Sequence, residues 1–529
     1  MGSWTPLTIQ PSFKASTMLL LTDGTVMCQA EGSKSWWKLS PDSGGSYVNG
    51  SWAALADMVN SRLYYASAVL ADGRVLVAGG EYSDGGSDAD KAEIYDPLSN
   101  AWTSIPTPGW GWIGDASACL LADGRLLLGS LTDARTAIYN PSTNTWTATG
   151  TMAARSNEET WVLLPDGSVV TVDCSNHPNA ERFVPSSGAW VGAGATPIEL
   201  VQASSIEIGP GVLLPTGRVF MVGATGHTAL YTPPSGGGTG TWQAGPDFPA
   251  DSQGRLVKAK DAPGCLLPNG HVLCVAGPAG DGAGDWPSPT MFFEFDGVGL
   301  NRVTDPPNAN TVTYEGRLLL LPTGQVLYAA GTSAIYVYTP TGYPDPAWRP
   351  TITNCPSSLL IGHTYTLQGT QLNGLSQAAS YGDDAQMATN YPLVRLHNVS
   401  SGGITYCRTA HHSTMGVATG AAVVSTTFTV PAGIPAGNYE LYVVANGISS
   451  DPVNVTCGPD GGTAHYMLVD KAFGGGSVLW AYAGSQWRYQ YVSDADLSGI
   501  AEDVFRANRV DVWWDESDRL TLVRPWKNE

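Results

Sequence analysis

Acidic side chains recur at one fixed place in the chain, about nine residues before the glycine of a repeated turn. Seven dipeptides occupy this place; four have an acidic second residue, and a fifth has a glutamate in its first position. Carboxylates that converge on one axis raise one another's pKa, and a fold keeps them together where a metal, a cationic ligand or proton transfer uses them. For any single one of these carboxylates, the alternative is a structural role, in which it accepts hydrogen bonds from backbone amides at the start of a strand. The candidate catalytic carboxylates are Asp115, Glu158, Glu207, Asp261 and Glu315.

The loops around the same strand starts supply a second set of side chains, suited to binding. Exposed aromatic rings stack on sugar rings, and charged or amide groups bind sugar hydroxyls. The alternatives are packing between repeats for the tryptophans and ordinary loop hydrogen bonds for the histidines. The candidate substrate-binding residues are Tyr82, Trp110, Trp112, Arg155, Glu159, His177, His227, Lys260 and Trp286.

A repeat of about 50 residues must position these side chains. Its first half is two apolar strands joined by a turn of the form (Asp/Pro)-x-Gly, where glycine permits a positive φ. Its second half is an aromatic strand and a strand that bears Trp, as in 92–102 and 136–146. Four strands per repeat predict an all-β fold, a seven-bladed kelch-type β-propeller. The seven copies of the first half are 18–28, 68–80, 119–129, 162–172, 212–223, 265–277 and 319–331.

The ends of the repeat region predict how the ring closes. The seventh copy stops at 334–340 without its Trp strand, and the chain begins with an unpaired one, Ser3-Trp4-Thr5-Pro6. We therefore expect the N-terminal strand to close the last blade, which removes exposed strand edges. The expected domains are 1–345 as the propeller, 346–460 as an immunoglobulin-like β-sandwich and 461–529 as a small α+β module.

Composition excludes several classes of partner. The formal charge of −20 argues against nucleic acid, and the absence of a run of 18 apolar residues argues against a membrane span. We expect a monomer that acts on a carbohydrate or small polar substrate. The first residues show no signal peptide, which predicts a cytoplasmic protein or a mature secreted form. Cys265 and Cys274 flank a turn, so they are either bonded across a hairpin or two buried thiols.

Kelch repeats followed by a sandwich that ends in PAGIPAGNYELYVVANG (431–447) resemble galactose oxidase and glyoxal oxidase. The resemblance implies copper held by two tyrosines and two histidines, with one tyrosine cross-linked to a cysteine and covered by an aromatic ring. Distances to the turn glycines place the two tyrosines at Tyr64 and Tyr314, and the covering ring at Tyr82. Glu315 stands where a histidine is implied, and Ala15 where the cysteine is implied. The remaining histidine is sought at His411 or His412.

These departures lead us to expect chemistry without copper. The leading prediction is an enzyme that uses carboxylate and tyrosine acid–base chemistry on a carbohydrate or polyol, by hydrolysis or β-elimination, with Tyr64 or Tyr314 as base or acid in the second case. No cofactor, or Ca²⁺, Mn²⁺, Zn²⁺ or Fe²⁺, is favoured over copper, because copper prefers imidazole. The alternatives are a divalent-metal enzyme, a non-catalytic glycan- or protein-binding propeller, and a galactose oxidase-like copper oxidase with a degenerate site.

Overall fold

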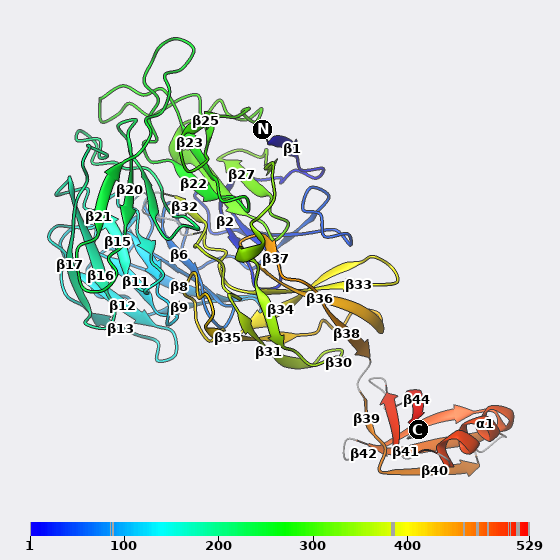
Figure 1. The fold of residues 1–529 in the computed structure, drawn as a ribbon. Coiled ribbons are helices and arrows are strands. Elements are labelled where there is room, and N and C mark those ends of the chain that lie inside the picture. Colours follow the sequence, from blue (N-terminus) through cyan, green and yellow to red (C-terminus); the bar gives the residue numbers. More distant parts are fainter. Residues whose placement is uncertain are drawn as a thin grey trace.

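The regular secondary structure of the computed structural model is almost entirely β-strand (Figure 1). It describes residues 2–526 apart from 85, 87–88, 382–386, 459–460, 472–475, 484–485, 506, 508 and 515–518. Among the described residues, no helix is both long and apolar enough to cross a membrane.

Seven antiparallel sheets form the propeller, and consecutive strands of each blade are hydrogen-bonded neighbours. Blades 1 to 3 contain β2 (Ala15–Leu20), β3 (Val26–Ala30), β4 (Trp36–Ser40) and β5 (Ser51–Ala54); β6 (Ala66–Val69), β7 (Val75–Ala78), β8 (Ala92–Asp96) and β9 (Ala101–Ile105); and β10 (Ala118–Leu120), β11 (Leu126–Gly129), β12 (Thr136–Asn140) and β13 (Thr145–Ala148). Blades 4 and 5 contain β14 (Val162–Leu163), β15 (Val169–Val172), β16 (Asn179–Val184) and β17 (Ala189–Ala195); and β18 (Gly211–Leu213), β19 (Val219–Val222), β20 (Thr228–Thr232) and β21 (Thr241–Ala244).

Blades 6 and 7 differ from the others because each receives a strand from a distant part of the chain. β1 (Ser3–Pro6) pairs with β28, so the N-terminus completes blade 7. β32, from beyond the propeller, pairs with the first strand of blade 6. Blade 6 contains β22 (Pro263–Leu266), β23 (Val272–Ala276), β24 (Met291–Phe295), β25 (Leu300–Arg302) and β32 (Ala379–Tyr381); blade 7 contains β26 (Gly316–Leu320), β27 (Val326–Ala330), β28 (Tyr336–Thr339) and β1.

Burial decreases from the inner to the outer strand of each blade, as the sequence pattern requires. β6 and β7 are buried at every position, whereas β9 alternates between exposed and half-buried residues. Tyrosine and tryptophan of the outer strands pack together, as in Tyr95–Trp102 with ring centroids 5.2 Å apart. The turn glycine Gly73 has φ +85°, a conformation that favours glycine. The predicted seven-bladed kelch-type propeller is confirmed.

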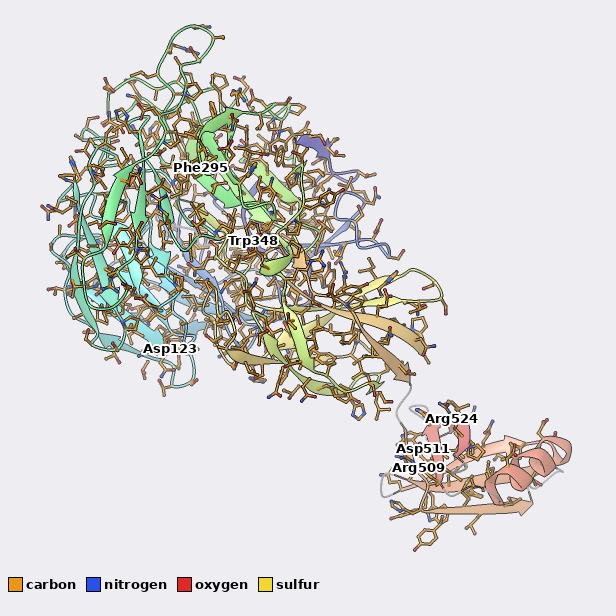
Figure 2. All side chains as sticks on the ribbon, viewed as in Figure 1. Asp123, Phe295, Trp348, Arg509, Asp511 and Arg524 are labelled. Carbon is orange, nitrogen blue, oxygen red and sulfur yellow. The ribbon has the colours of Figure 1, made fainter. Side chains whose placement is uncertain are left out.

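A β-sandwich follows the propeller and covers the face that carries the glycine turns (Figure 1). Backbone hydrogen bonds join Thr409 N–H to Thr22 O at 3.0 Å and Met415 N–H to Ala122 O at 2.8 Å, and Trp348, in a 3₁₀ turn (Pro346–Trp348), lies at this boundary (Figure 2). Its strands are β29 (Thr351–Asn354), β30 (Ser358–Leu360), β31 (Thr364–Thr370), β33 (Leu393–Asn398), β34 (Ile404–Ala410), β35 (Val423–Thr429), β36 (Gly437–Ala445), β37 (Ile448–Ser449) and β38 (Val453–Gly458).

A small α+β unit ends the chain. Two three-stranded sheets, β39–β43–β44 and β40–β41–β42, pack with one helix, which is N-capped by the hydroxyl of Ser493 accepting from Asp496 N–H at 3.1 Å. The elements are β39 (Gly461–Thr463), β40 (Tyr466–Lys471), β41 (Ser477–Ala483), β42 (Gln486–Val492), α1 (Asp494–Phe505), β43 (Arg509–Trp514) and β44 (Leu520–Trp526).

Cys265 and Cys274 are buried thiols and do not form a disulfide. The hairpin register pairs Cys265 with Leu273 and Cys274 with Gly264. Because adjacent residues of a strand point to opposite faces, this offset of one residue separates the two sulfur atoms. Burial raises the pKa of both thiols well above the usual range.

Candidate functional site

The segments that lead into the inner strands share an uncommon backbone conformation. Tyr64, Glu158 and Asp261 have φ values of +50°, +61° and +46°, and Tyr82, in the loop after β7, has +47°. Non-glycine residues adopt the left-handed region rarely and at a cost of about 1–3 kcal/mol, and they cluster at functional sites. Four such residues in these channel-mouth loops mark this face of the propeller as the candidate site.

Two phenol rings meet at the channel mouth. Tyr64, just before β6, and Tyr314, in a 3₁₀ turn (Thr313–Glu315) just before β26, have ring centroids 6.2 Å apart at an interplanar angle of 80°. Tyr82 lies edge-on to Tyr64 at 6.5 Å, and Trp286 lies edge-on to Tyr314 at 5.0 Å. Burial raises the pKa of Tyr314, and the carboxylates of Glu315 and Asp261 raise it further. The structure thus joins aromatic side chains from blades 2, 6 and 7.

Arg317 supports this phenol pair, and the sequence analysis missed it. Its guanidinium carbon lies 5.4 Å from the centroid of the Tyr64 ring, and Nη1 donates to Tyr314 O at 2.7 Å. The side chain is almost completely buried in β26, a strand that is otherwise apolar. An arginine inside an apolar inner strand is the signal that could have identified it, because a buried charge requires partners.

Two glutamates form a second cluster on the same face. Glu158 and Glu207 are hydrogen-bonded to each other through their side chains, and burial raises the pKa of both well above the usual range. Asp261 raises both further, and Asp115 also acts on Glu158. A hydrogen-bonded carboxyl pair in this environment favours the protonated form more strongly than exposed carboxyl groups do.

Lys260 provides a buried cation beside these carboxylates. Its ammonium lies 4.1 Å from the centroid of the Trp286 ring and donates to Ala283 O at 3.1 Å and Asp285 O at 3.3 Å. Burial lowers the pKa of Lys260, and Glu207 and Asp261 act in the opposite direction. The lysine therefore fixes the 282–286 loop, and with it the tryptophan that contacts Tyr314.

The remaining predicted binding residues fall into two groups of three. The first group lies in surface loops of this face of the propeller. Trp112 is half exposed, Trp110 lies under the guanidinium of Arg135 at 5.6 Å, and Arg155 donates weakly to Ser175 Oγ at 3.4 Å. These are surface loop positions.

The second group of predicted binding residues forms hydrogen bonds or ion pairs with side chains outside the phenol pair and the carboxyl cluster. Glu159 is fully buried inside blade 4, where Trp161 Nε1 donates to its carboxylate at 2.9 Å and burial raises its pKa. His177 pairs with Glu199 at 2.9 Å, and His227 with Asp247 at 2.8 Å.

His411 and His412 lie at the other end of the blade from Tyr64. The backbone N–H of His412 donates to Ala71 O at 3.2 Å, beyond the C-terminal end of β6, whereas Tyr64 precedes β6. Seven residues of extended chain separate Tyr64 from Ala71, roughly 20 Å. The ring of His412 is buried against Tyr391 and bonded to Thr426, and burial lowers its pKa to about 3. The structure does not bring this pair to the phenols.

The sandwich domain approaches the site through a different segment. β32 runs antiparallel to β22, with Tyr381 opposite Pro263, two residues after Asp261. Residues 382–386, which follow, lie outside the described residues, and the sequence from 364 to 396 contains no histidine. The entry of β32 into blade 6 was not predicted.

The donors at the phenol pair are oxygen atoms. All eight histidines belong to the described residues, and none is in the segments that carry Tyr64, Tyr82, Trp286 or Tyr314. Glu315 is bonded by the hydroxyl of Thr311. Within the described part of the chain, no group of three or more His, Cys, Asp or Glu side chains is arranged to hold a metal. Cu(II) accepts oxygen donors but prefers imidazole, so Tyr64, Tyr314 and Glu315 fit copper as a weaker, oxygen-donor site.

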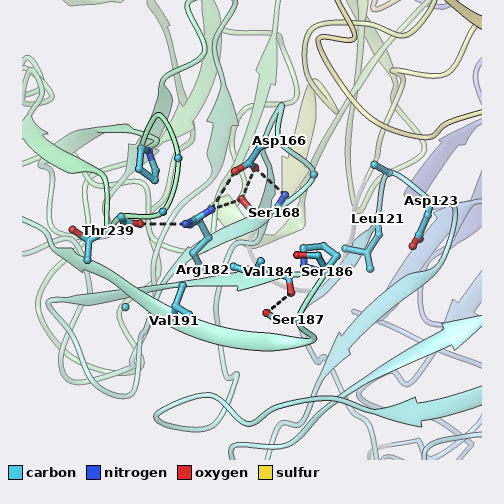
Figure 3. Close-up of a pocket in the computed structure, with 18 residues that line it drawn as sticks. Leu121, Asp123, Asp166, Ser168, Arg182, Val184, Ser186, Ser187, Val191 and Thr239 are labelled. Carbon is cyan, nitrogen blue, oxygen red and sulfur yellow. Dashed lines mark hydrogen bonds and ion pairs between the residues drawn. The ribbon is translucent and has the colours of Figure 1, made fainter. Parts of the chain in front are cut away.

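A cavity of about 1030 Å³ lies away from this chemistry (Figure 3). It is lined by turns of the sandwich-facing side, including Asp123 and Asp166, and by the Pro185 and Pro234 loops. Arg182 lies beside it, where Nη1 pairs with Asp166 at 3.1 Å and Nη2 donates to Gly238 O at 3.2 Å. Because Arg182 is already paired and the strained, aromatic and carboxyl side chains gather at the channel mouth, we assign the site to the channel mouth.

Comparisons with known proteins agree with this architecture. The kelch motif matches residues 62–109. Two galactose oxidases of Gibberella zeae are 45% identical to the chain over 56 residues, which is 11% of this chain and only 8% of the length of these relatives. A solved fungal alcohol oxidase of the AA5 family, in complex with copper, superimposes with a TM-score of 0.50 at 15% identity, over 86% of this chain and 99% of that one.

These comparisons correct two predictions. Hydrolysis and β-elimination are wrong, because the similar proteins are oxidases. The preference for no cofactor, or for Ca²⁺, Mn²⁺, Zn²⁺ or Fe²⁺ over copper, is also wrong, because the solved relative in fold is a copper complex. Carboxylates in a channel mouth suit several chemistries, so their presence alone misled the prediction. The resemblance itself is confirmed: the chain contains a kelch motif, is similar to galactose oxidases over 56 residues, and has a fold similar to that of a copper-containing alcohol oxidase of the AA5 family.

Proposed function

We propose that the chain oxidises a small polar alcohol at the channel mouth, in a galactose oxidase-like site that holds copper through oxygen donors. The observation that carries the proposal is the phenol pair, Tyr64 and Tyr314, with ring centroids 6.2 Å apart. These are the two positions to which the resemblance assigns copper-binding tyrosines. The similarity to named oxidases supports the same chemistry.

Tyr64, Tyr314 and Glu315 are the residues we assign to the metal. Bound copper would supply an acceptor for one of the two electrons that the alcohol loses. Both electrons and both protons end on dioxygen, which leaves as hydrogen peroxide. Arg317, beside the Tyr64 ring, favours a negatively charged phenolate, whereas the carboxylates near Tyr314 disfavour one.

Proton transfer is assigned to the carboxyl cluster. Glu158 and Glu207 share a hydrogen bond, so the pair can hold a proton removed from a substrate hydroxyl. Asp261 raises the pKa of both Glu158 and Tyr314, so it is close enough to influence both groups. Tyr82, which is 59% exposed, and Trp286 present aromatic surfaces for the carbon skeleton of the alcohol.

Hydrogen peroxide release by the copper-loaded protein tests the proposal. We would offer galactose, glycerol, benzyl alcohol and glyoxal, with copper alone as the blank. We expect peroxide with at least one alcohol, and a loss of about 100-fold or more in Tyr314→Phe. The matched control is Tyr343→Phe, which changes a tyrosine that is 92% exposed. Peroxide that persists unchanged in Tyr314→Phe, or is absent with every substrate, would contradict the proposal.

A second candidate function is binding of the same class of ligand without turnover. It is favoured by one observation, that no histidine belongs to the segments carrying the phenols in the described chain. Calorimetric titration of the metal-free protein with galactose and glycerol separates the two candidates. Saturable binding that Tyr82→Ala weakens, together with no peroxide after copper loading, would support binding alone.

A further inference from the structure

One sheet of the C-terminal unit has two very different faces. Because side chains alternate along a strand, Met467, Leu479 and Ala481 point to one face, where they pack against the apolar cluster that includes Val512 of β43. Their neighbours in sequence point to the other face. No element of the described unit packs on that second face, since α1 and β43 contribute to the first.

The second face carries an array of aromatic rings, which we call the aromatic platform. The strand register aligns Tyr466, Tyr482 and Trp487 in one row and places Trp480 beside Tyr489 in the next. Ring centroids are 6.1 Å apart for Tyr466–Tyr482, 5.3 Å for Tyr482–Trp487 and 5.3 Å for Trp480–Tyr489. The platform consists of Tyr466, Trp480, Tyr482, Trp487, Tyr489 and Tyr491.

The platform is open to solvent. Tyr466 is 66% exposed, Trp487 is 41% exposed and Tyr491 is 67% exposed, and the adjacent Leu468 is 55% exposed. Burying such rings on folding would have stabilised the unit, and contiguous exposed apolar surface on a soluble protein marks a binding site. The unit follows β38 and stands beside the sandwich, away from the channel mouth (Figure 1).

The charges of the unit restrict its partner. Residues 461–529 contain ten acidic and seven basic residues, so a phosphate backbone would be repelled. Charged side chains gather on the other sheet, where Arg509 pairs with Asp511 at 2.8 Å and Asp511 lies opposite Arg524 (Figure 2). A neutral ligand with flat apolar faces is the chemistry that an aromatic array of this kind recognises, because rings stack on such faces.

We propose that the aromatic platform binds a neutral β-1,4-linked polysaccharide. In β-1,4-linked chains of glucose or N-acetylglucosamine the ring substituents are equatorial, which leaves both faces of each sugar ring apolar. A row of adjacent, tilted aromatic rings can contact several such sugars at once. The rims of the tyrosine and tryptophan rings offer hydroxyl and N–H groups to the sugar hydroxyls. The site is independent of the channel mouth, and it would anchor the protein on a polymer rather than transform it.

A groove between β42, α1 and β44 meets the platform at Tyr491. It has a volume of about 650 Å³, and Tyr491 of the platform is among the residues that line it. Asp496 and Asp503 of α1 also line it, and their carboxylates suit sugar hydroxyls that project past the last ring.

Retention of the full-length protein by polysaccharides tests the proposal. The probes are microcrystalline cellulose and chitin in sedimentation assays, and hydroxyethylcellulose and single-stranded DNA in affinity gels. We expect retention by cellulose or chitin, and a loss of about tenfold or more in affinity for Trp487→Ala/Tyr491→Ala. Tyr466→Ala provides a second variant should the first fail to fold. The matched control, Tyr343→Ala, removes an exposed tyrosine of the propeller region and should retain full binding.

Several outcomes would overturn the proposal. They are no retention by any polysaccharide, retention that neither platform variant weakens, and retention by DNA alone. Self-association that the platform variants abolish, without any binding of polysaccharide, would identify the platform as an interface between two copies and would also overturn it. Peroxide release at the channel mouth is unaffected by these variants, so failure here is distinguishable from failure of the proposed oxidase activity.

Discussion

Glu158 and Glu207 are buried carboxyl groups at the channel mouth whose pKa values are raised by their surroundings. Burial is the first cause of the raised pKa of each, and repulsion between neighbouring carboxylates is the second. A carboxyl group whose pKa is higher in the folded than in the unfolded state stabilises the fold fully at pH values below its unfolded pKa. That stability is lost as the pH rises toward the folded pKa.

Replacing one of the pair tests this directly. Glu207→Gln keeps a hydrogen-bond donor toward Glu158 and removes one titrating group. We expect the variant and the wild type to be equally stable near pH 4. At pH 8 we expect the variant to be more stable, by about 1.4 kcal/mol for each unit by which folding raises the pKa of Glu207. Chemical unfolding between pH 4 and pH 9 measures the difference. The control is Glu199→Gln, which changes an exposed carboxylate paired with His177. If the difference in free energy of unfolding between Glu207→Gln and the wild type does not change with pH, the expectation is wrong.

The segments before the inner strands are positioned by buried ion pairs as well as by the strands. Arg62 and Glu93 are both fully buried, with Nη2 and Oε1 2.7 Å apart. Arg62 Nη1 also donates to Lys91 O at 2.9 Å, and Glu93 accepts from Val59 N–H at 2.7 Å. This network fixes the loop that carries Tyr64, two residues after Arg62.

Breaking that network should damage both stability and the site. Arg62→Ala leaves the Glu93 carboxylate buried and unpaired, and we expect a loss of about 3–5 kcal/mol in the free energy of unfolding. The double variant Arg62→Met/Glu93→Leu should recover most of it, because no charge remains buried. Urea unfolding of the three proteins measures this. A single variant as stable as the wild type would show that the pair does not hold the loop.

The elements differ in how far the sequence predicts them. The seven hairpins were predictable because apolar runs and turn glycines such as Gly73 are local features. The same glycines gave the register that places Tyr64 and Tyr314, whose rings the structure brings to 6.2 Å. β32 was not predictable, because Ala379–Tyr381 has no strand pattern and its partner, β22, lies far away in the sequence. The chemistry was predicted wrongly because acidic loops fit hydrolases and oxidases equally well.

In the whole molecule, the β-sandwich packs closely against the turns of the propeller. Gly447, with φ +68°, meets the turn glycine Gly324 so closely that a Cβ would lie 2.6 Å from the Gly324 Cα. Gly73 likewise lies against Arg408, whose Nη2 donates to Asp72 O at 3.0 Å. These approaches fix the sandwich, from which β32 reaches blade 6.

A side chain at Gly447 should separate the two domains. We expect Gly447→Val to lose more stability than Gly402→Val, because both glycines have positive φ but only Gly447 faces backbone. The control loses about 1 kcal/mol from conformational strain alone. Limited proteolysis and thermal unfolding would compare the two. Equal losses would mean that the backbone contact at Gly324 contributes nothing to docking.

The assignment of the channel mouth as the functional site depends most directly on whether the phenol pair holds copper. Titration of the metal-free protein with Cu(II), followed by visible and paramagnetic resonance spectra, measures this for the wild type, Tyr314→Phe and Tyr343→Phe. We predict about one equivalent bound by the wild type and by Tyr343→Phe, and an affinity at least tenfold lower for Tyr314→Phe. Absence of saturable binding, or identical affinity in all three proteins, would contradict the assignment of Tyr64 and Tyr314 as the copper site.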